Sequence, residues 1–429
     1  MENQNRDIIK DPVYLSDGIT FQEFDSADFS MHYLLIINNK HYKITNELYL
    51  LVKTIEEFHT LDEITQIFSQ KISQPVSSQE VVRFINNELV PKSIIKGDGF
   101  CKVKPEKSYL YLKKTLFSEK MQRPFTWMLQ SLFNTNAACI MITLIFITHY
   151  YAIANYWGLT SIFDFAKDPF LFSISFLIIG FSCIFHEFGH TSACRYYGIK
   201  GQEIGFGLYM TMFVFYSNIT ECWRLNPKDR CVVNIAGIYF QFILNIGLFL
   251  FFLFTNQIIF IYAMKIICIQ AIFSLNPFLR FDGYWLATDL LGIPNLRKKS
   301  TNLFSAIVKK YLKKQPVSIP FLADIKMSSK IIFFFYAIVS NLFILIFIVF
   351  IYNRFPNQIN QFLTVISILK ESIFNNDYSN ILLNIYQFVM NGLILFFMLF
   401  FGYRIIKPIL KFSSKLILPP ISKGADAII

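Results

Sequence analysis

Long apolar runs separated by short polar loops dominate the chain after residue 130. Each run is close to the roughly 20 residues that a helix needs to cross a bilayer. The uncharged stretch Cys231–Met264 is too long for one crossing, and Thr255, Asn256 and Gln257 form its natural break. We therefore predict a polytopic α-helical membrane protein with about six spanning helices, at roughly Asn136–Tyr156, Phe170–His190, Cys231–Phe254, Ile258–Phe278, Ile331–Asn353 and Ile381–Tyr403.

The first hundred residues have a different pattern, which is typical of a small α+β domain. Two apolar stretches, Tyr33–Ile37 and His41–Ile44, flank a polar turn and predict a β-hairpin. Amphipathic stripes then predict three helices, and Ile94 and Ile95 can form a closing strand. The three helices are expected at Asn46–Phe58, Leu61–Ile72 and Gln79–Leu89. This order of elements predicts a winged-helix-like domain.

Charge separates these two regions. Residues 1–100 contain 9 Lys and Arg against 15 Asp and Glu, whereas the rest of the chain has a net charge of +17. Basic residues gather in the loops at one side of the predicted helices, so the positive-inside rule places both termini in the cytoplasm of a cell-membrane protein. The basic, aromatic stretch Tyr109–Trp127 is expected to lie on the membrane surface. Since the N-terminal domain is acidic, nucleic acid is not an expected partner.

The sequence His186-Glu187-Phe188-Gly189-His190 closes a run, Pro169–Phe185, that contains no charged residue. On a helix, residues four apart share a face, so His186 and His190 can bind one zinc ion while Glu187 acts as general base toward the attacking water. A bare HExxH pattern is a weak signal. Ionisable groups at bilayer depth are costly, however, and this favours a functional site.

A catalytic zinc ion needs a third protein ligand. Asp282 is the better candidate, because it follows Asn276-Pro277 at the end of a predicted span, on the same side of the membrane as His190. Asn276 can hydrogen-bond the scissile carbonyl, and a simple capping role is the alternative. Cys183 and Cys194 flank the motif and are rival ligands, although small cysteines inside helices more often serve in packing.

The segment Phe185–Gly198, together with Asn276-Pro277 and Asp282-Gly283, resembles the site-2 protease family of intramembrane zinc metalloproteases. The motif Arg280-Phe281-Asp282-Gly283-Tyr284-Trp285 resembles the sequences of the family's bacterial branch, the peptide zinc metalloproteases. The resemblance covers roughly residues 130–300, and it implies that His186, His190 and Asp282 bind zinc and that Glu187 activates water. No PDZ-like insertion lies between the third and fourth spans, where many relatives have one.

The order of elements in residues 1–100 is similar to that of PqqD-like modules, which bind leader peptides of ribosomally made natural products. In those modules the leader adds as a strand to the sheet edge and lies against a helix. This resemblance implies Tyr33, Ile36, Val82 and Ile85 as peptide contacts. The alternative is a domain that only stabilises the protein or that contacts a partner protein.

The segments Ile204–Tyr209 and Met212–Tyr216 read as strands or re-entrant loops. In the site-2 protease family such strands hold an unwound substrate. Phe206, Tyr209 and Asn218 are therefore candidate substrate contacts, while a Gly-rich surface loop is the alternative.

Four regions follow from these patterns: a recognition domain (1–100), an amphipathic linker (101–135), a catalytic membrane core (136–300), and a basic linker with two further helices (301–429). The expected function is a zinc endopeptidase that cleaves a peptide precursor or a membrane-associated peptide. Maturation or export of a bacteriocin-like or signalling peptide fits best, with a peptide exporter or modifying enzyme as a partner. The alternative is a non-proteolytic export or immunity protein that retains the scaffold for binding peptide.

Overall fold

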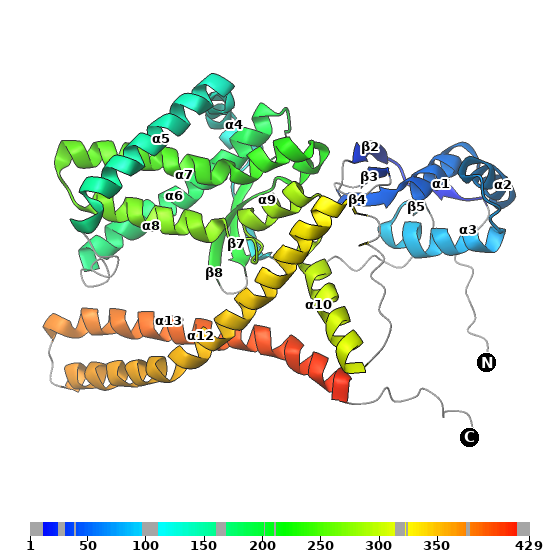
Figure 1. The fold of residues 1–429 in the computed structure, drawn as a ribbon. Helices are drawn as coiled ribbons and strands as arrows, with labels where there is room; N and C mark the ends of the chain where they lie inside the picture. Colours follow the sequence, from blue (N-terminus) through cyan, green and yellow to red (C-terminus); the bar gives the residue numbers. More distant parts are fainter. Residues whose placement is uncertain are drawn as a thin grey trace. The chain divides into compact units, whose positions relative to one another are not determined.

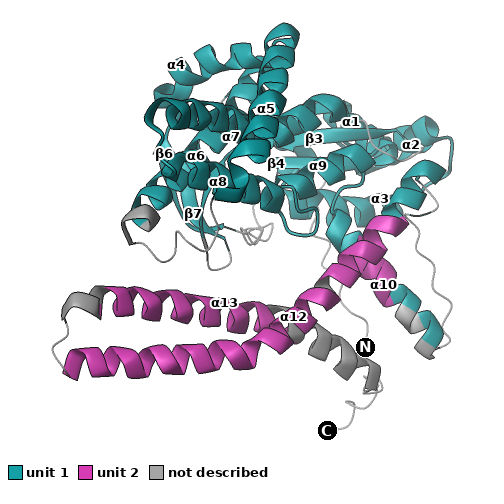
Figure 2. Ribbon diagram, turned by 60° about the vertical axis from the view of Figure 1, so that its left-hand side comes forward, with its two compact units in different colours: residues 1–299, 306–333 teal, residues 300–305, 334–429 magenta. Residues whose placement is uncertain are grey.

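The computed structural model describes residues 12–24, 31–37, 40–96, 110–159, 169–200, 202–209, 212–313, 322, 325–374 and 378–417. These residues form two compact units (Figure 2). The first contains residues 1–299 and 306–333, and the second contains residues 300–305 and 334–429. The Asn276 turn and all three expected zinc ligands lie within the first unit.

The N-terminal domain begins the first unit and is rich in strands (Figure 1). Strands β2, β3 and β4 form an antiparallel sheet in that order, and β1 pairs with β5. The strands are β1 (Tyr14–Leu15), β2 (Thr20–Phe24), β3 (His32–Ile37), β4 (Lys40–Thr45) and β5 (Ile95–Lys96), and the helices are α1 (Asn46–Glu57), α2 (Leu61–Ile72) and α3 (Ser78–Phe84). The predicted hairpin, three helices and closing strand are confirmed, but the winged-helix assignment stays a prediction.

An apolar core joins the sheet of this domain to its three helices. Leu35, Leu51, Ile55, Ile64 and Ile85 are all fully buried in it. Since one such side chain contributes about 1.5–3 kcal/mol when it leaves water, this core stabilises the packing of the sheet against the helices.

The linker contains a strand and a helix, and its place on the membrane surface stays a prediction. Residues Leu110–Phe117 form a strand, β6, and only Glu119–Leu129 form a helix, α4. Strand β6 pairs with β7 (Ile204–Tyr209), which in turn pairs with β8 (Met212–Ser217) in an antiparallel sheet. The basic residues Lys113 and Lys114 therefore belong to a strand, because β7 supplies the backbone partner that no local signal reveals.

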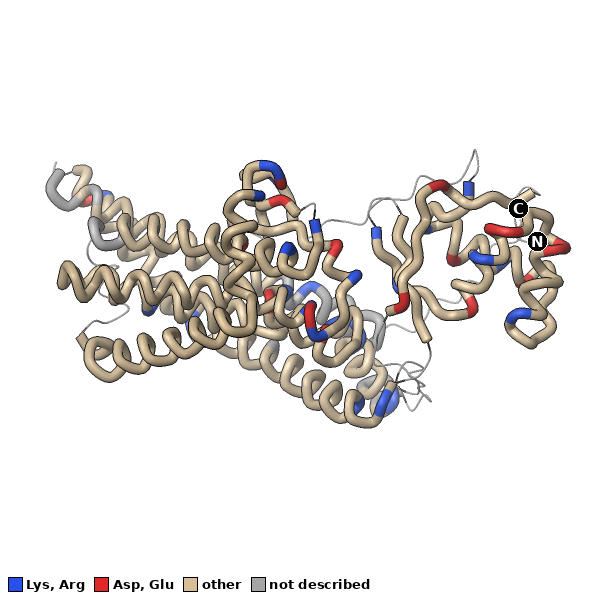
Figure 3. Tube along the Cα trace, turned by 90° about the horizontal axis from the view of Figure 1, so that it is seen from above, with Lys and Arg blue, Asp and Glu red and all other residues tan. Residues whose placement is uncertain are grey.

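Four apolar helices follow in the first unit: α5 (Thr135–Asn155), α6 (Pro169–Tyr196), α7 (Pro227–Thr255) and α8 (Ile259–Ser274). Among the described residues, five helices are long and apolar enough to cross a membrane, including α5, α6 and α7. Helix α8 has 16 residues, or about 24 Å at 1.5 Å per residue. It falls short of an ordinary span, so the count of six stays a prediction. In Figure 3, where charged residues are blue or red, long stretches of helix are almost entirely tan.

Helices α9 (Asp282–Leu291) and α10 (Leu296–Lys313) follow α8. The last two helices, α12 (Met327–Phe374) and α13 (Tyr378–Ile417), are much longer than the predicted spans at Ile331–Asn353 and Ile381–Tyr403. In the part of α12 beyond its predicted span, polar pairs join it to α13: Gln358 hydrogen-bonds Asn391 at 3.1 Å, and Asn384 hydrogen-bonds Ser372 at 2.6 Å.

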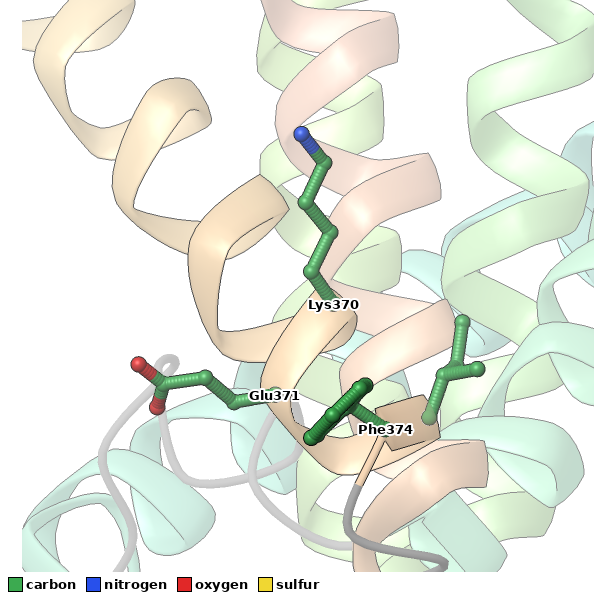
Figure 4. Close-up of a pocket in the computed structure, with 4 residues that line it drawn as sticks. Lys370, Glu371 and Phe374 are labelled. Atoms are coloured by element: carbon green, nitrogen blue, oxygen red, sulfur yellow. The ribbon is translucent and has the colours of Figure 1, made fainter.

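A pocket lies at the C-terminal end of α12, in the second unit (Figure 4). Its lining residues are Lys370, Glu371, Ile373 and Phe374. The lysine and the glutamate point away from each other, and Phe374 lies at the helix end. None of these residues belongs to the motifs that carry the expected chemistry.

Candidate metal centre

Helix α6 positions the HExxH motif as the sequence predicts. His186 and His190 lie one turn apart on one face, with their ring centroids 4.8 Å apart. Both histidines and Glu187 are buried, with less than a tenth of each residue exposed. The apolar residues before them place this polar cluster at the end of a long membrane-compatible helix.

Asp282 reaches the same point from α9, of which it is the first residue. The chain arrives there through a turn after α8, in which the Asn276 Oδ1 accepts hydrogen bonds from the backbone N–H groups of Phe278 (2.8 Å) and Leu279 (3.3 Å). Gly283 makes the approach possible, because a Cβ at this position would lie 2.0 Å from the carbonyl oxygen of Leu275. The Asn276 side chain thus stabilises the turn between α8 and α9, and its contact with a substrate carbonyl stays a prediction.

The three side chains converge on one small volume. The Asp282 Oδ2 lies 2.9 Å from the His186 Nε2, and the Asp282 Oδ1 lies 3.5 Å from the His190 Nε2. Their ligand atoms all lie within 4.8 Å of one another, which among the described residues marks the candidate metal site. Two imidazole nitrogens and one carboxylate form a donor set that suits zinc and leaves a fourth position for water or substrate.

Hydrogen bonds orient two of these ligands. The His190 Nδ1 donates to the carbonyl oxygen of Val233 at 2.7 Å, so its Nε2 is the nitrogen that faces the cluster. The hydroxyl of Ser274 donates to the Asp282 Oδ2 at 2.7 Å. Burial would raise the pKa of the Asp282 carboxyl, but the adjacent imidazoles lower that pKa well below its ordinary value. The contacts with Ser274 and the two imidazoles fix the position of the Asp282 carboxyl group.

Helix α9 is anchored to α7 two turns beyond Asp282. The Asp289 carboxylate accepts hydrogen bonds from the Arg230 Nε and the Asn234 Nδ2, both at 2.7 Å. Burial raises the pKa of Asp289, whereas the charge of Arg230 opposes this effect. Removing one partner of such a buried pair is costly, because the other charge stays behind unpaired. This clamp therefore holds the helix that carries Asp282.

Helix α7 also leaves space for the His186 ring at Gly237, where a Cβ would lie 2.4 Å from the His186 Nε2. We expect Gly237→Ala to displace that ring and to weaken zinc binding by about 5- to 150-fold, the equivalent of about 1–3 kcal/mol of overpacking. Chelator competition on the purified protein measures the affinity.

Gly247→Ala is the matched control for this variant, because Gly247 lies on the same helix and a Cβ there would meet nothing within 4 Å. Equal zinc affinity of the two variants would contradict the close approach of α7 to His186.

The rival ligands occupy other surroundings. The Cys183 Sγ accepts a hydrogen bond from the Gln270 Nε2 at 2.8 Å. Cys194 is buried in an apolar cluster with Cys222, Val233 and Ala236. Neither thiol belongs to the candidate metal site. The structure therefore brings Asp282, and not a cysteine, to the two histidines.

The predicted peptide contacts of the N-terminal domain are placed less favourably. Strand β3, which carries Tyr33 and Ile36, is the central strand of its sheet, so an added strand would have to pair with β2 or β4. Tyr33 stacks on Tyr49 at 3.8 Å, and Ile36 is buried. Ile85 is fully buried in the core, whereas Val82 is half-buried beside it. The choice of these four residues stays a prediction.

The predicted substrate contacts on and beside the β6–β7–β8 sheet lie closer to the metal ligands than those of the N-terminal domain do. Phe206 and Tyr209 are half-buried on β7, and Tyr209 packs edge-on against Phe281, the residue before Asp282. Asn218 is exposed beyond β8, where its Oδ1 accepts a hydrogen bond from Thr220 at 2.8 Å. These residues stay candidates for binding a substrate.

Sequence reasoning missed the residues that support the ligands, namely Val233, Gly237 and Ser274. Val233 acts through its backbone and Gly237 through the absence of a side chain, so neither residue type indicates its role. The signal that could have found Gly237 is its position on the uncharged span that follows the motif helix. A small residue in such a span often marks a close helix–helix contact.

Comparison with known proteins agrees with this geometry. Residues 174–398, more than half of the chain, match the model of peptidase family M50. The chain is also similar to the "Putative peptide zinc metalloprotease protein YydH" of Bacillus subtilis strain 168, at 24% identity over 194 residues, which are 44% of this chain and 72% of that protein. No solved structure matches. The matched region contains the HExxH helix, the α7 support and the Asp282 turn, and the chain belongs to peptidase family M50, the site-2 protease family.

Proposed function

We propose that this protein is a multi-pass membrane zinc endopeptidase that cuts a peptide precursor, or a membrane-associated peptide, within or next to the bilayer. The convergence of His186, His190 and Asp282 within 4.8 Å is the observation that carries the proposal. The family, the name of the relative and this donor set imply zinc as the cofactor. An integral membrane protein is consistent with the apolar helices and with the family.

The residues have separate tasks in this reaction. Zinc, when bound, polarises the scissile carbonyl and makes water more acidic. Glu187 lies one position along α6 from His186, where its carboxylate takes a proton from the attacking water and then passes it to the leaving amine. Val233 and Ser274 keep His190 and Asp282 oriented, and Asn276 is the candidate donor to the scissile carbonyl.

The sheet beside these ligands is the proposed seat of the extended substrate. Strand β7 is paired on both sides, so β8 is an outer strand of the sheet as described. Strand β8 also packs beside α6, which carries the motif. A peptide that adds to β8 would be extended, and its backbone would be exposed to attack. Phe206, Tyr209 and Asn218 are the proposed side-chain contacts.

The N-terminal domain is proposed to select the substrate. Its sheet offers β2 and β4 as outer strands, and a PqqD-like module would capture a leader peptide by such strand addition. This assignment favours a ribosomally synthesised precursor, whose mature part is a bacteriocin-like or signalling peptide, and a peptide exporter or modifying enzyme as a further partner. Both termini are proposed to be cytoplasmic.

Reconstitution in liposomes tests this function. The substrate would be the precursor encoded by a short reading frame beside this gene, and mass spectrometry would identify the products. Zinc-dependent cleavage at a single position is expected. Binding without cleavage by the zinc-loaded protein would instead support the non-proteolytic export or immunity role.

A further inference from the structure

The face of α7 that contacts α6 carries polar groups beyond those that support the metal ligands. The two helices run antiparallel, and their contacts recur every four residues: His190 with Val233, His186 with Gly237, and Ser182 with Gln241. Four residues advance about 6 Å along a helix. Asn245 is the next residue of α7 in this row, about 12 Å beyond Gly237. The row therefore leads from the metal ligands into the apolar part of the bundle.

Each amide in the row joins several helices. The Gln241 Nε2 donates to the Ser182 Oγ at 3.2 Å and to the Gln270 Oε1 of α8 at 3.1 Å. The Asn245 Nδ2 lies 3.1 Å from the His149 Nε2 of α5 and 3.4 Å from the Cys268 Sγ of α8.

The histidine fixes the orientation of the Asn245 amide. The His149 Nδ1 lies 2.8 Å from the carbonyl oxygen of Ile145, so it carries the proton and the His149 Nε2 accepts. The Asn245 amide must therefore present its nitrogen to His149, and its oxygen points elsewhere.

Three polar atoms of residues in this row are buried and have no hydrogen-bond partner among the described residues. They are the Gln241 Oε1, the Asn245 Oδ1 and the His186 Nδ1. Gln241 is 1% exposed and Asn245 is fully buried. Two of the atoms accept hydrogen bonds, whereas the His186 Nδ1 must donate when the Nε2 binds metal. A metal-ligating histidine almost always donates its second N–H to a partner. A water molecule can accept from one such atom and donate to the next.

We propose that Gln241, Asn245 and His149 line a buried file of water that begins at the Nδ1 of His186 and extends between α5, α6, α7 and α8. In this file Gln241 is a positioning residue, which acts on His186 through a bound water. The presence of this water does not depend on the proposed function. Only its use does: it would hydrate a hydrolytic site from the side away from His190. The opposite result is a dry row of amides that only clamps the helices together.

Cys268 provides a native probe of water, because its thiol contacts the Asn245 amide. The thiol of a variant with Cys268 as the sole cysteine would be followed by infrared spectroscopy, as S–H converts to S–D after transfer into D₂O. Cys268 is half-buried, so its matched control is the same thiol in Asn245→Leu, while Cys194, fully buried in another cluster, gives the rate of a dry thiol in a second single-cysteine variant. We expect Cys268 to exchange about tenfold faster than Cys194 or more, and Asn245→Leu to remove this advantage.

Equally slow exchange of both thiols in the folded protein would overturn the proposal. If Asn245→Leu does not fold, His149→Phe closes the same end of the row and serves in its place. This experiment uses no substrate, so a protein that fails to cleave peptides could still show the water file.

Zinc affinity tests the role of Gln241. We expect Gln241→Leu to weaken zinc binding about 10- to 100-fold, as losses of outer-shell partners do. Asn245→Leu lies one step further away and is expected to bind zinc as the wild type does. Gln241→Glu keeps an acceptor oxygen and is expected to restore affinity. An unchanged thermal transition of the metal-free Gln241→Leu protein separates this effect from misfolding, and wild-type zinc affinity in that variant would contradict the positioning role.

Discussion

Replacing Glu187 by glutamine is expected to lower the cleavage rate by about 10²- to 10⁴-fold, the usual contribution of a general acid–base group. Glutamine has nearly the same shape as glutamate but cannot take the proton of the attacking water. Glu187 is not one of the three candidate zinc ligands, so the zinc content of the variant should equal that of the wild type. The loss would therefore lie in the chemical step and not in the assembly of the site.

The experiment compares initial rates and zinc content of the wild type, Glu187→Gln and Glu119→Gln in the same liposomes. Glu119 is exposed in the first turn of α4, so its variant controls for loss of a carboxylate as such. His186→Ala should lose zinc as well as cleavage. Glu187→Gln that still cuts at the wild-type rate would refute the role of Glu187 as the base.

Much of the metal site could be predicted from the sequence, because its chemistry has a local signature. The spacing of His186 and His190 requires only one regular helix, and α6 provides it. Asp282 was harder to identify, yet the preceding Asn276-Pro277 pair indicated that a helix ends shortly before it. The structure agrees on that point, because α8 ends at Ser274 and Asp282 begins α9.

The surroundings of the ligands could not be predicted, because they depend on which helices and strands become neighbours. The carbonyl of Val233 and the missing side chain of Gly237 have meaning only once α7 lies against α6. In the same way, Leu110–Phe117 became a strand because β7, almost a hundred residues later, supplies its partner. The position of β2 beside β3 was missed for the same reason, and it changes which strands of the N-terminal sheet can accept a peptide.

The ends of the last two helices also differ from those predicted from the sequence. The predicted spans Ile331–Asn353 and Ile381–Tyr403 implied a loop between them, yet α12 continues to Phe374. Polar side chains in this stretch hydrogen-bond α13, and so the region that looked too polar for a span remains helical. Charge patterns alone therefore indicated where apolar spans end, but not where the helices end.

The second large effect is expected for Asp282→Ala, which removes the carboxylate that the structure brings to 2.9 Å from His186 and 3.5 Å from His190. Four-ligand structural zinc sites bind with about 10–16 kcal/mol, so one ligand is worth on the order of 3 kcal/mol. That energy corresponds to about a hundredfold loss of zinc affinity. Purified wild type should contain about one zinc ion per chain, and the variant should lose most of it during dialysis against a weak chelator.

Metal analysis of detergent-purified protein measures this loss, with Asp289→Asn beside it as a matched control. Asp289 lies on the same helix and holds α9 to α7, so its variant tests whether a loosened helix alone releases the metal. A much larger loss in Asp282→Ala than in Asp289→Asn assigns the effect to direct ligation. Full zinc retention in folded Asp282→Ala would require another third ligand. Cys183 and Cys194 would then be tested, although the structure pairs Cys183 with Gln270 and packs Cys194 with Cys222.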